Sequence, residues 1–311
     1  MALDAMGKPG RRRFEGCIVG LAVGDALGAA THGLTRHEIR ARWGRVSAFV
    51  GAADLKAGQY TSQTQTAIAL GQSIVERSRF EPQAAASALR DWCASGEPRR
   101  PSPGMAEACE RLMRGAAWDE SASGSADCGC AARAAIIGLV HCRNGERLVE
   151  DAVACSLITH RDPRAVAAAV AVATAVAYLI AAEAALDVQT LLERAAAASA
   201  AQGQEVAAAT TGIAQLLDLA PRIAMDELGY SSFALEAVPA AIYCFASAPD
   251  RFDESVLLAV NTGGDASSIA AIAGALGGAY LGLEGIPPRW VEGVEASQRL
   301  QQLARELHAL A

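Results

Sequence analysis

The stretch VNTGGDASSIAAIAGALGGAYLG, residues 260–282, gives the strongest indication of the architecture in this sequence. Gly274, Gly278 and Gly282 recur at every fourth position, so they share one face of a helix. Glycine inside a helix costs about 1 kcal/mol relative to alanine, and a whole face of glycine needs a compensating contact. We therefore expect a central helix that a neighbouring backbone approaches closely.

Composition extends this prediction to all 311 residues. Apolar residues make up 52% of the chain and aromatic residues 5%, so Ala, Leu, Val and Ile build the core, and alternating strand patterns are negligible. No repeat or long linker divides the sequence. We expect an all-α fold, a compact single-domain multi-helix bundle over residues 14–311 that follows a lead-in of residues 1–13. The expected helices cover residues 14–30, 64–79, 82–94, 105–114, 147–159, 163–185, 188–201, 205–219, 232–246, 252–260, 267–281 and 288–307.

Charge and hydropathy exclude two classes of partner. The net charge of −7 gives no reason to expect nucleic acid, and the Arg11-Arg12-Arg13 cluster is interpreted as a solvated lead-in. Residues 165–182 are uncharged and long enough to span a membrane, but their alanine-rich content predicts weak insertion. We interpret them as a buried central helix and expect no membrane partner.

The eight cysteines are scattered, and no C-x-x-C pair or nearby histidine completes a zinc site. We interpret them as free thiols in a reducing cytoplasm. Residues 1–13 lack the apolar run of a signal peptide, which also favours a cytoplasmic protein.

Three polar segments, residues 20–33, 58–70 and 261–268, have the character of site loops. The last two lead into helices, whose N-terminal N–H groups attract phosphates and carboxylates, so they predict a cradle for a phosphorylated ligand. The candidate ligand-binding residues are Asp25, Thr61, Ser62, Gln63, Asn261, Gly263, Gly264, Ser267 and Ser268. Structural roles stay open from spacing alone, because Thr61 can cap a helix and Asp25 can serve a neighbouring helix start. Asp265 can likewise be a helix cap or a site acid.

Five ordered segments carry a family resemblance over residues 14–292. They are GCIVGLAVGDALG (16–28), YTSQTQTAIAL (60–70), DCGCAARAAIIGL (127–139), SLITHRDPRAVAAA (156–169) and VNTGGDASSIAAIAGALGGAYLGLEGIPPRW (260–290). The sequence resembles the ADP-ribosylglycohydrolase family, whose motifs are G-x-A-x-G-D-A-L-G, T-D-D-T, N-G-x-x-M-R-x-x-P, T-H-x-x-P/A and G-G-D-x-D-T followed by I-P-x-x-W. The resemblance implies an all-α bundle with its site in the cleft where these loops converge. It adds Cys128, Gly129, Arg133 and His160 to the candidate ligand-binding residues.

The resemblance also implies a chemistry, the hydrolysis of the bond between ADP-ribose and an acceptor. In the family, two Mg²⁺ ions are held by the Thr and two Asp of the T-D-D-T segment and by the two Asp and the Thr or Ser of the last motif. The corresponding residues here are Thr61, Ser62, Gln63, Asp265, Ser267 and Ser268. Asp265 alone remains of four metal-binding carboxylates, and neutral Ser and Gln oxygens compete poorly with the hydration shell of Mg²⁺. We therefore expect no metal cofactor at these degenerate positions, where Gln63 and the serines can satisfy one another.

Three functions remain open. The first is the binding of ADP-ribose or a related nucleotide, free or on an ADP-ribosylated protein, without magnesium-dependent hydrolysis. The second is metal-independent hydrolysis of an N- or O-glycosidic bond, with Asp265 or His32 as the catalytic general base; His32 aligns with a Glu that follows the family's first motif. The third is a structural or partner-binding use of the fold.

Overall fold

The computed structural model describes residues 10–182 and 185–311, and these residues form sixteen α-helices and no β-strand. The prediction of an all-α fold is confirmed. The helices are α1 Arg11–Gly28, α2 Arg36–Trp43, α3 Ser62–Arg77, α4 Pro82–Ala94, α5 Pro103–Met113, α6 Ala134–Val140, α7 Gly145–Leu157, α8 Pro163–Ala181, α9 Val188–Ser199, α10 Gln204–Leu216, α11 Pro221–Leu228, α12 Ala234–Ala246, α13 Phe252–Thr262, α14 Ala266–Leu281, α15 Pro288–Gly293 and α16 Ser297–Leu310.

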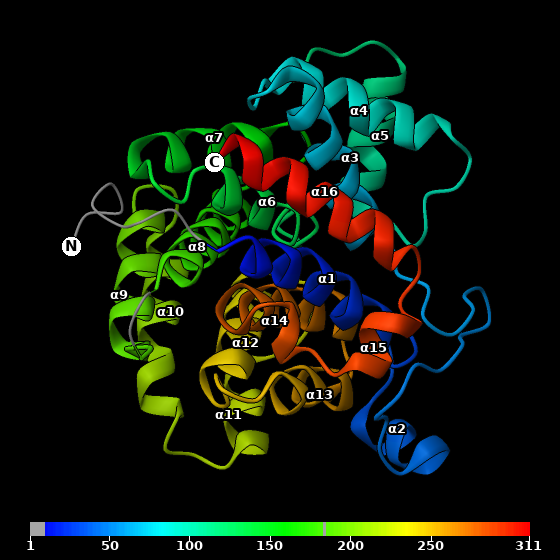
Figure 1. Ribbon diagram of the computed structural model, residues 1–311, viewed down its shortest axis with the longest axis vertical. Helices are drawn as coiled ribbons and strands as arrows, with labels where there is room; N and C mark the ends of the chain where they lie inside the picture. The colour runs from blue at the N-terminus through cyan, green and yellow to red at the C-terminus, as the bar shows by residue number, and fades with distance from the viewer. Residues whose placement is uncertain (1–9, 183–184) are drawn as a thin grey trace.

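At the centre, α1 and α14 lie against each other through glycine (Figure 1). A Cβ atom on Gly20 would lie 2.2 Å from the Gly274 carbonyl oxygen, and a Cβ on Gly24 would lie 1.9 Å from the Ala270 carbonyl oxygen. The contacts ascend α1 as they descend α14, so the two helices run antiparallel. Only glycine permits this approach, because any side chain would collide with the facing backbone. The predicted close approach to the glycine face is confirmed.

Helix α8 is the long apolar helix that the sequence predicts. In the described part of the chain it is the one helix long and apolar enough to cross a membrane, yet 89% of that apolar window is buried inside the protein. Its alanine and valine side chains pack against α6, α7 and α9. The prediction of a buried central helix is confirmed.

The arginine cluster near the N-terminus belongs to α1; Arg11 and Arg12 are exposed, as expected, and Arg13 is partly buried. Arg12 pairs with the buried Glu15 at 2.6 Å and with Glu284, and Arg13 donates to the Leu179 carbonyl oxygen at the end of α8 (3.1 Å). These partners extend the helix three residues before its expected start at residue 14. Residues 1–9 of the expected lead-in lie outside the described residues.

Helices α2, α6 and α11 are not among the expected ones. Helix α2 begins with a capping box, in which Thr35 and Glu38 bond each other's backbone N–H groups. The helix expected over residues 288–307 is instead two helices, α15 and α16. Ala296 lies at the break with a left-handed φ of 54°.

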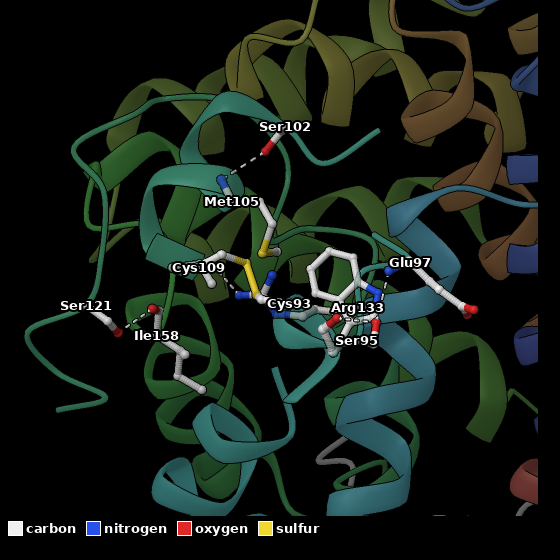
Figure 2. Close-up of a disulfide and its surroundings, with 11 residues drawn as sticks. Cys93, Ser95, Glu97, Ser102, Met105, Cys109, Ser121, Arg133 and Ile158 are labelled. Carbon is white, nitrogen blue, oxygen red and sulfur yellow. Dashed lines mark hydrogen bonds between the residues drawn. A yellow bond between two sulfur atoms is a disulfide. The ribbon is translucent and has the colours of Figure 1, made fainter. Parts of the chain in front are cut away.

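The expectation that every cysteine is a free thiol is wrong for one pair. Cys93 of α4 and Cys109 of α5 form a disulfide, with their Cα atoms 5.9 Å apart (Figure 2). Their spacing in sequence gives no signal, because the two helices become neighbours only through the fold. The other six cysteines are buried thiols: Cys17, Cys128, Cys130, Cys142, Cys155 and Cys244.

Candidate functional site

The site begins with the way α3 starts. Asp25, buried on α1, accepts hydrogen bonds from the N–H and hydroxyl of Thr61 (3.0 and 2.7 Å) and from the N–H and hydroxyl of Thr64 (3.0 and 2.7 Å). Burial, which these hydrogen bonds offset only in part, raises the pKa of Asp25 to about 6. Thr61 is also the N-cap, since its hydroxyl accepts from the Gln63 N–H. Asp25 and Thr61 therefore have the structural roles that the sequence left open for them.

A backbone link joins the loop after α1 to the loop before α14. The Gly33 N–H donates to the Gly264 carbonyl oxygen (2.8 Å), and the Gly264 N–H donates to the Leu34 carbonyl oxygen (2.9 Å). Gly263 and Gly264 have φ of 84° and 60°, a left-handed backbone that favours glycine. This link sets the two candidate catalytic side chains beside each other.

His32 and Asp265 form that pair. His32 Nδ1 lies 3.2 Å from Asp265 Oδ1 and 2.8 Å from the Ser267 hydroxyl oxygen. The His32 side chain is 38% exposed, whereas that of Asp265 is 6% exposed. The imidazole therefore directs Nδ1 to Asp265 and Ser267, with the carboxylate on the buried side of the pair and the histidine on the exposed side.

Two further donors surround the Asp265 carboxylate. The Cys128 thiol donates to Oδ2 (3.2 Å), and the Ser268 N–H donates to Oδ1 (3.4 Å), which makes Asp265 the N-cap of α14. Burial opposes ionisation, but His32 and the side chains of Ser268 and Cys128 together lower the pKa of Asp265. Burial and the adjacent carboxylate raise the pKa of the Cys128 thiol, so Cys128 is a neutral donor. Asp265 is thus both a helix cap and the acid of the cluster.

Gln63 joins α3 to α14. Its Nε2 donates to the Ser268 hydroxyl oxygen (2.9 Å), so a serine satisfies one end of the Gln63 carboxamide. Its Oε1 is buried and has no hydrogen-bond partner. Buried polar atoms without a partner are uncommon, so this oxygen marks a position that can accept an N–H or O–H from a bound molecule or water.

Residues 95–102, here called the strap, connect α4 to α5 and lie against the start of α3. The Ser62 N–H donates to the Arg99 carbonyl oxygen (2.7 Å), and the Ser62 hydroxyl donates to the Arg100 carbonyl oxygen (3.0 Å). The Arg100 guanidinium donates to the Ala29 carbonyl oxygen beyond α1 (2.7 Å). The expectation of free N–H groups at this helix start is therefore wrong, because the strap, Thr61 and Asp25 already occupy them.

The third and fourth motifs meet in a separate buried network. Asp127 accepts from His160 Nε2 (2.8 Å) and from the N–H groups of Gly104 and Gly129 (2.8 and 2.9 Å). Burial lowers the pKa of His160, but Cys130 and Asp127 outweigh it and raise that pKa to about 9. Burial opposes ionisation of Asp127 as well, but His160 lowers its pKa far below the ordinary range. The pair clamps the two motifs together.

Arg133 completes this network from the start of α6. It is fully buried and donates to the carbonyl oxygens of Gly129 (3.3 Å) and Cys155 (3.1 Å) and to the Thr159 hydroxyl. Arg133, Gly129 and His160 therefore hold the loop that carries Cys128, and the structure gives each of them an internal partner.

Asn261 also has internal partners. Its carboxamide exchanges two hydrogen bonds with the backbone of Val46 (2.8 and 2.9 Å) and so fastens that loop to α13. A groove of about 680 Å³ lies between α3 and α4, but none of the candidate residues lines it. The residues at the motif loops are instead closed over, with Ser62, Gln63 and Ser267 only 4%, 6% and 4% exposed.

The candidates thus divide into two sets. One is a contiguous cluster of His32, Gln63, Cys128, Asp265, Ser267 and Ser268. The remaining candidates have internal partners and hold the helix starts and loops around that cluster in place. Asp127 is not among the expected residues, and Thr64, at the same polar helix start as Thr61, is expected only as a possible helix cap. The strap was missed because it acts through carbonyl oxygens, which every residue carries.

Metal donors are sparse at this cluster. Within residues 10–182 and 185–311, no group of three or more His, Cys, Asp or Glu side chains could hold a metal ion. Asp265 is the carboxylate among the positions that the sequence resemblance assigns to metal ligands, and its oxygens already accept hydrogen bonds from protein groups. The neutral Gln63 and Ser268 side chains are bonded to each other.

The glycine-packed helix pair and the polar loops at two helix starts lie in the segments that resemble the ADP-ribosylglycohydrolase class, and the sequence model of that family matches residues 6–311. The chain belongs to the ADP-ribosylglycohydrolase family. It is 37% identical to a protein of Archaeoglobus fulgidus over 96% of both chains. It is 29% identical to the ADP-ribosylarginine hydrolase Tri1 of Pseudomonas putida, over 95% of this chain and 77% of the relative. The solved structure of an ADP-ribosylglycohydrolase-related protein complex superposes with a TM-score of 0.78 at 26% identity, covering 96% of this chain and 98% of that one.

Proposed function

We propose that the protein binds ADP-ribose or a related nucleotide, free or attached to a protein, and does not hydrolyse it by the magnesium-dependent route of its family. The family and the relative Tri1, an ADP-ribosylarginine hydrolase, support the ligand class. The single observation that supports binding without the magnesium-dependent route is the hydrogen bond between Gln63 and Ser268 (2.9 Å). Both residues lie at positions that the family resemblance assigns to metal ligands.

The donor set does not suit a pair of Mg²⁺ ions. Magnesium prefers carboxylate oxygens and its own waters, and one carboxylate, Asp265, cannot offset a charge of +4. The Ser62 hydroxyl is directed to the Arg100 carbonyl oxygen, and Asp265 accepts from Cys128. A neutral ligand group is the better occupant, because the unpartnered Gln63 oxygen needs a donor and a nucleotide ribose offers hydroxyl donors.

Titration calorimetry with ADP-ribose tests the binding. We expect the same affinity in Mg²⁺ and in EDTA, since no step of binding uses the metal. Binding that appears only with Mg²⁺ would contradict the metal-free site, and absence of binding to ADP-ribose and related nucleotides would contradict the proposal as a whole.

Restoring the acids provides the complementary test. We expect the Ser62→Asp, Gln63→Asp and Ser267→Asp triple variant to gain a Mg²⁺-dependent increase in melting temperature, because a ligand that binds only the folded state stabilises it. The control carries Asn at the same three positions, which has the same shape without charge and should not respond. If the acidic triple variant also fails to respond to Mg²⁺, the assignment of these positions is wrong.

The contact between His32 and Asp265 favours a second candidate, metal-independent glycosidic hydrolysis. Asp265 holds Nδ1 of the partly exposed His32 at 3.2 Å, the arrangement in which an acid orients a general base. Turnover of an ADP-ribosylated peptide in EDTA would support this candidate, provided that His32→Ala and Asp265→Ala each abolish it. Turnover that survives both substitutions would remove the proposed roles.

A further inference from the structure

The Cys93–Cys109 disulfide joins α4 and α5, the two helices that the strap connects. Cys93 is the penultimate residue of α4, and Cys109 lies within α5. The disulfide therefore closes a covalent ring of the chain that contains residues 95–102 (Figure 2). Figure 2 shows Ser95 and Glu97 at the start of this connection and Ser102 at its end, where Ser102 caps α5. The same ring therefore carries the covalent bond and the carbonyl groups that cover Ser62.

Apart from the disulfide, the strap is held by polar contacts. None of residues 95–102 is buried. Arg99 pairs with Glu295 and Arg100 pairs with Asp54, and ion pairs of partly exposed side chains contribute little to stability. Gln65 exchanges two hydrogen bonds with the strap backbone. A segment with few buried apolar contacts belongs to the part of a protein that opens locally at low free energy.

The backbone of Arg100 is under strain. Its φ of 49° is left-handed, which a residue with a side chain adopts only when its surroundings require it. Its carbonyl oxygen accepts from the Ser62 hydroxyl, so this strained residue is also a point of contact with the candidate site. Opening of the strap would relieve the strain and break that contact in one movement.

We propose that the Cys93–Cys109 disulfide is a redox latch, which holds the strap closed over the start of α3 when oxidised and releases it when reduced. Release frees the Ser62 N–H and hydroxyl from the carbonyl groups of Arg99 and Arg100. Both freed groups lie at the N-terminus of α3, where hydrogen-bond donors favour a negatively charged ligand group such as a phosphate. The consequence for ligand binding rests on the proposed function, whereas the latch itself does not.

The chemistry is thiol–disulfide exchange with a dithiol reductant. A thiolate of the reductant attacks the sulfur of Cys93, the more exposed of the pair, and releases Cys109 as a thiolate that takes up a proton. The second thiol of the reductant attacks the mixed disulfide, so Cys93 is released as a thiol and the reductant leaves as its own disulfide. Exchange with a small-molecule disulfide, which is reduced to thiols, closes the latch again.

Hydrogen–deuterium exchange of the whole protein, oxidised or treated with dithiothreitol, tests the latch. Complete reduction is checked by the mass increase of two hydrogens. We expect amide exchange in peptides covering residues 60–66 and 96–104 to accelerate by about tenfold or more, while α8 remains protected, because only a local opening is added. Unchanged exchange in both peptides would overturn the proposal. Equal acceleration in α8 would also overturn it, because the disulfide would then stabilise the whole fold and not the strap alone.

The Cys93→Ser, Cys109→Ser double variant is the matched control. It should exchange like the reduced wild-type protein and should not respond to dithiothreitol. A double variant whose strap peptides match the oxidised wild-type protein would contradict the latch. If the double variant does not fold, the comparison of the two wild-type redox states decides alone.

Calorimetry with ADP-ribose in the two redox states separates the latch from the proposed function. We expect tighter binding after reduction. Equal, measurable affinity in both states would overturn the link between the strap and the ligand. Binding in neither state would count against the proposed function, and the exchange experiment would still decide whether the strap opens.

Discussion

Asp25 shows, at the scale of one residue, how a buried carboxylate can organise a site without belonging to it. It accepts four hydrogen bonds from Thr61 and Thr64, and it lies on the central helix α1. The sequence predicts this possibility from an acid in a small-residue helix followed by a threonine-rich helix start. The sequence cannot reveal that both threonines bind the same carboxylate, because that depends on how α3 is placed on α1.

Substitution of Asp25 separates its charge from its hydrogen bonds. We expect Asp25→Ala to lower the free energy of unfolding by about 2–5 kcal/mol, because two N–H groups and two hydroxyls lose a buried acceptor. Asp25→Asn keeps a carbonyl oxygen for most of these donors and should cost less. Urea unfolding of the two variants and the wild-type protein at one pH measures the difference. Equal losses in both variants would show that the oxygen acceptor is not the stabilising group.

The raised pKa of Asp25 predicts a pH dependence. Its pKa in the folded protein is about 6, above the ordinary value of 3.8, because burial disfavours the charged carboxylate by more than the hydrogen bonds favour it. The stability that Asp25 contributes is complete below 3.8 and is lost as the pH rises through 6. Between pH 4.5 and 7 the free energy of unfolding of the wild-type protein should therefore fall by about 2 kcal/mol relative to that of Asp25→Asn. This figure follows from about 1.4 kcal/mol per pKa unit. Parallel stability profiles would contradict the raised pKa.

At the scale of elements, the strength of the sequence pattern explains which helices could be predicted and which could not. The glycine face of α14 and the uncharged run of α8 are strong periodic signals, and both predictions are confirmed. Helix α2 was missed although Thr35 and Glu38 form a capping box, since its eight residues bury only Ile39 and give no apolar period. The strap has no sequence signal, because its contacts depend on backbone carbonyls and on a disulfide that forms after α4 and α5 meet.

The α1–α14 contact predicts a sharp difference between glycine positions. We expect Gly24→Ala to destabilise the protein by about 1–3 kcal/mol or more, because the new methyl group would lie 1.9 Å from the Ala270 carbonyl oxygen and neither backbone can yield. Gly212→Ala, inside α10 with nothing within 4 Å, is the control. It should stabilise the protein by up to about 1 kcal/mol, because alanine is the better helix former.

Urea denaturation of these two variants measures both effects. Since each adds one methyl group to a helical glycine, helix propensity alone would make both changes favourable. A Gly24→Ala variant as stable as the wild-type protein would show that the two central helices are not packed backbone to backbone.

At the scale of the whole molecule, the first and last helices of the described chain pack against each other. Helix α1 lies against α14 and α16, and α16 also contacts α3, so residues near both termini share one core (Figure 1). The side chains of Leu300, Leu303 and Leu307 on α16 are buried in that core. The candidate site therefore depends on contacts between distant parts of the sequence, and no stretch of consecutive residues contains it.

This arrangement predicts that residues 14–311 unfold as one domain. Detachment of α1 exposes the glycine face of α14, and detachment of α16 exposes the parts of α1 and α3 that it covers, so partial unfolding leaves the remaining helices without a central partner. We expect differential scanning calorimetry of the oxidised protein to give a single transition whose calorimetric and van't Hoff enthalpies agree. Two transitions, or a calorimetric enthalpy well above the van't Hoff value, would show independent units. Reduction of the disulfide should leave one transition, because the strap inside its ring has no buried residue and adds little to the unfolding enthalpy. A new low-temperature transition would place the strap in a separate unit.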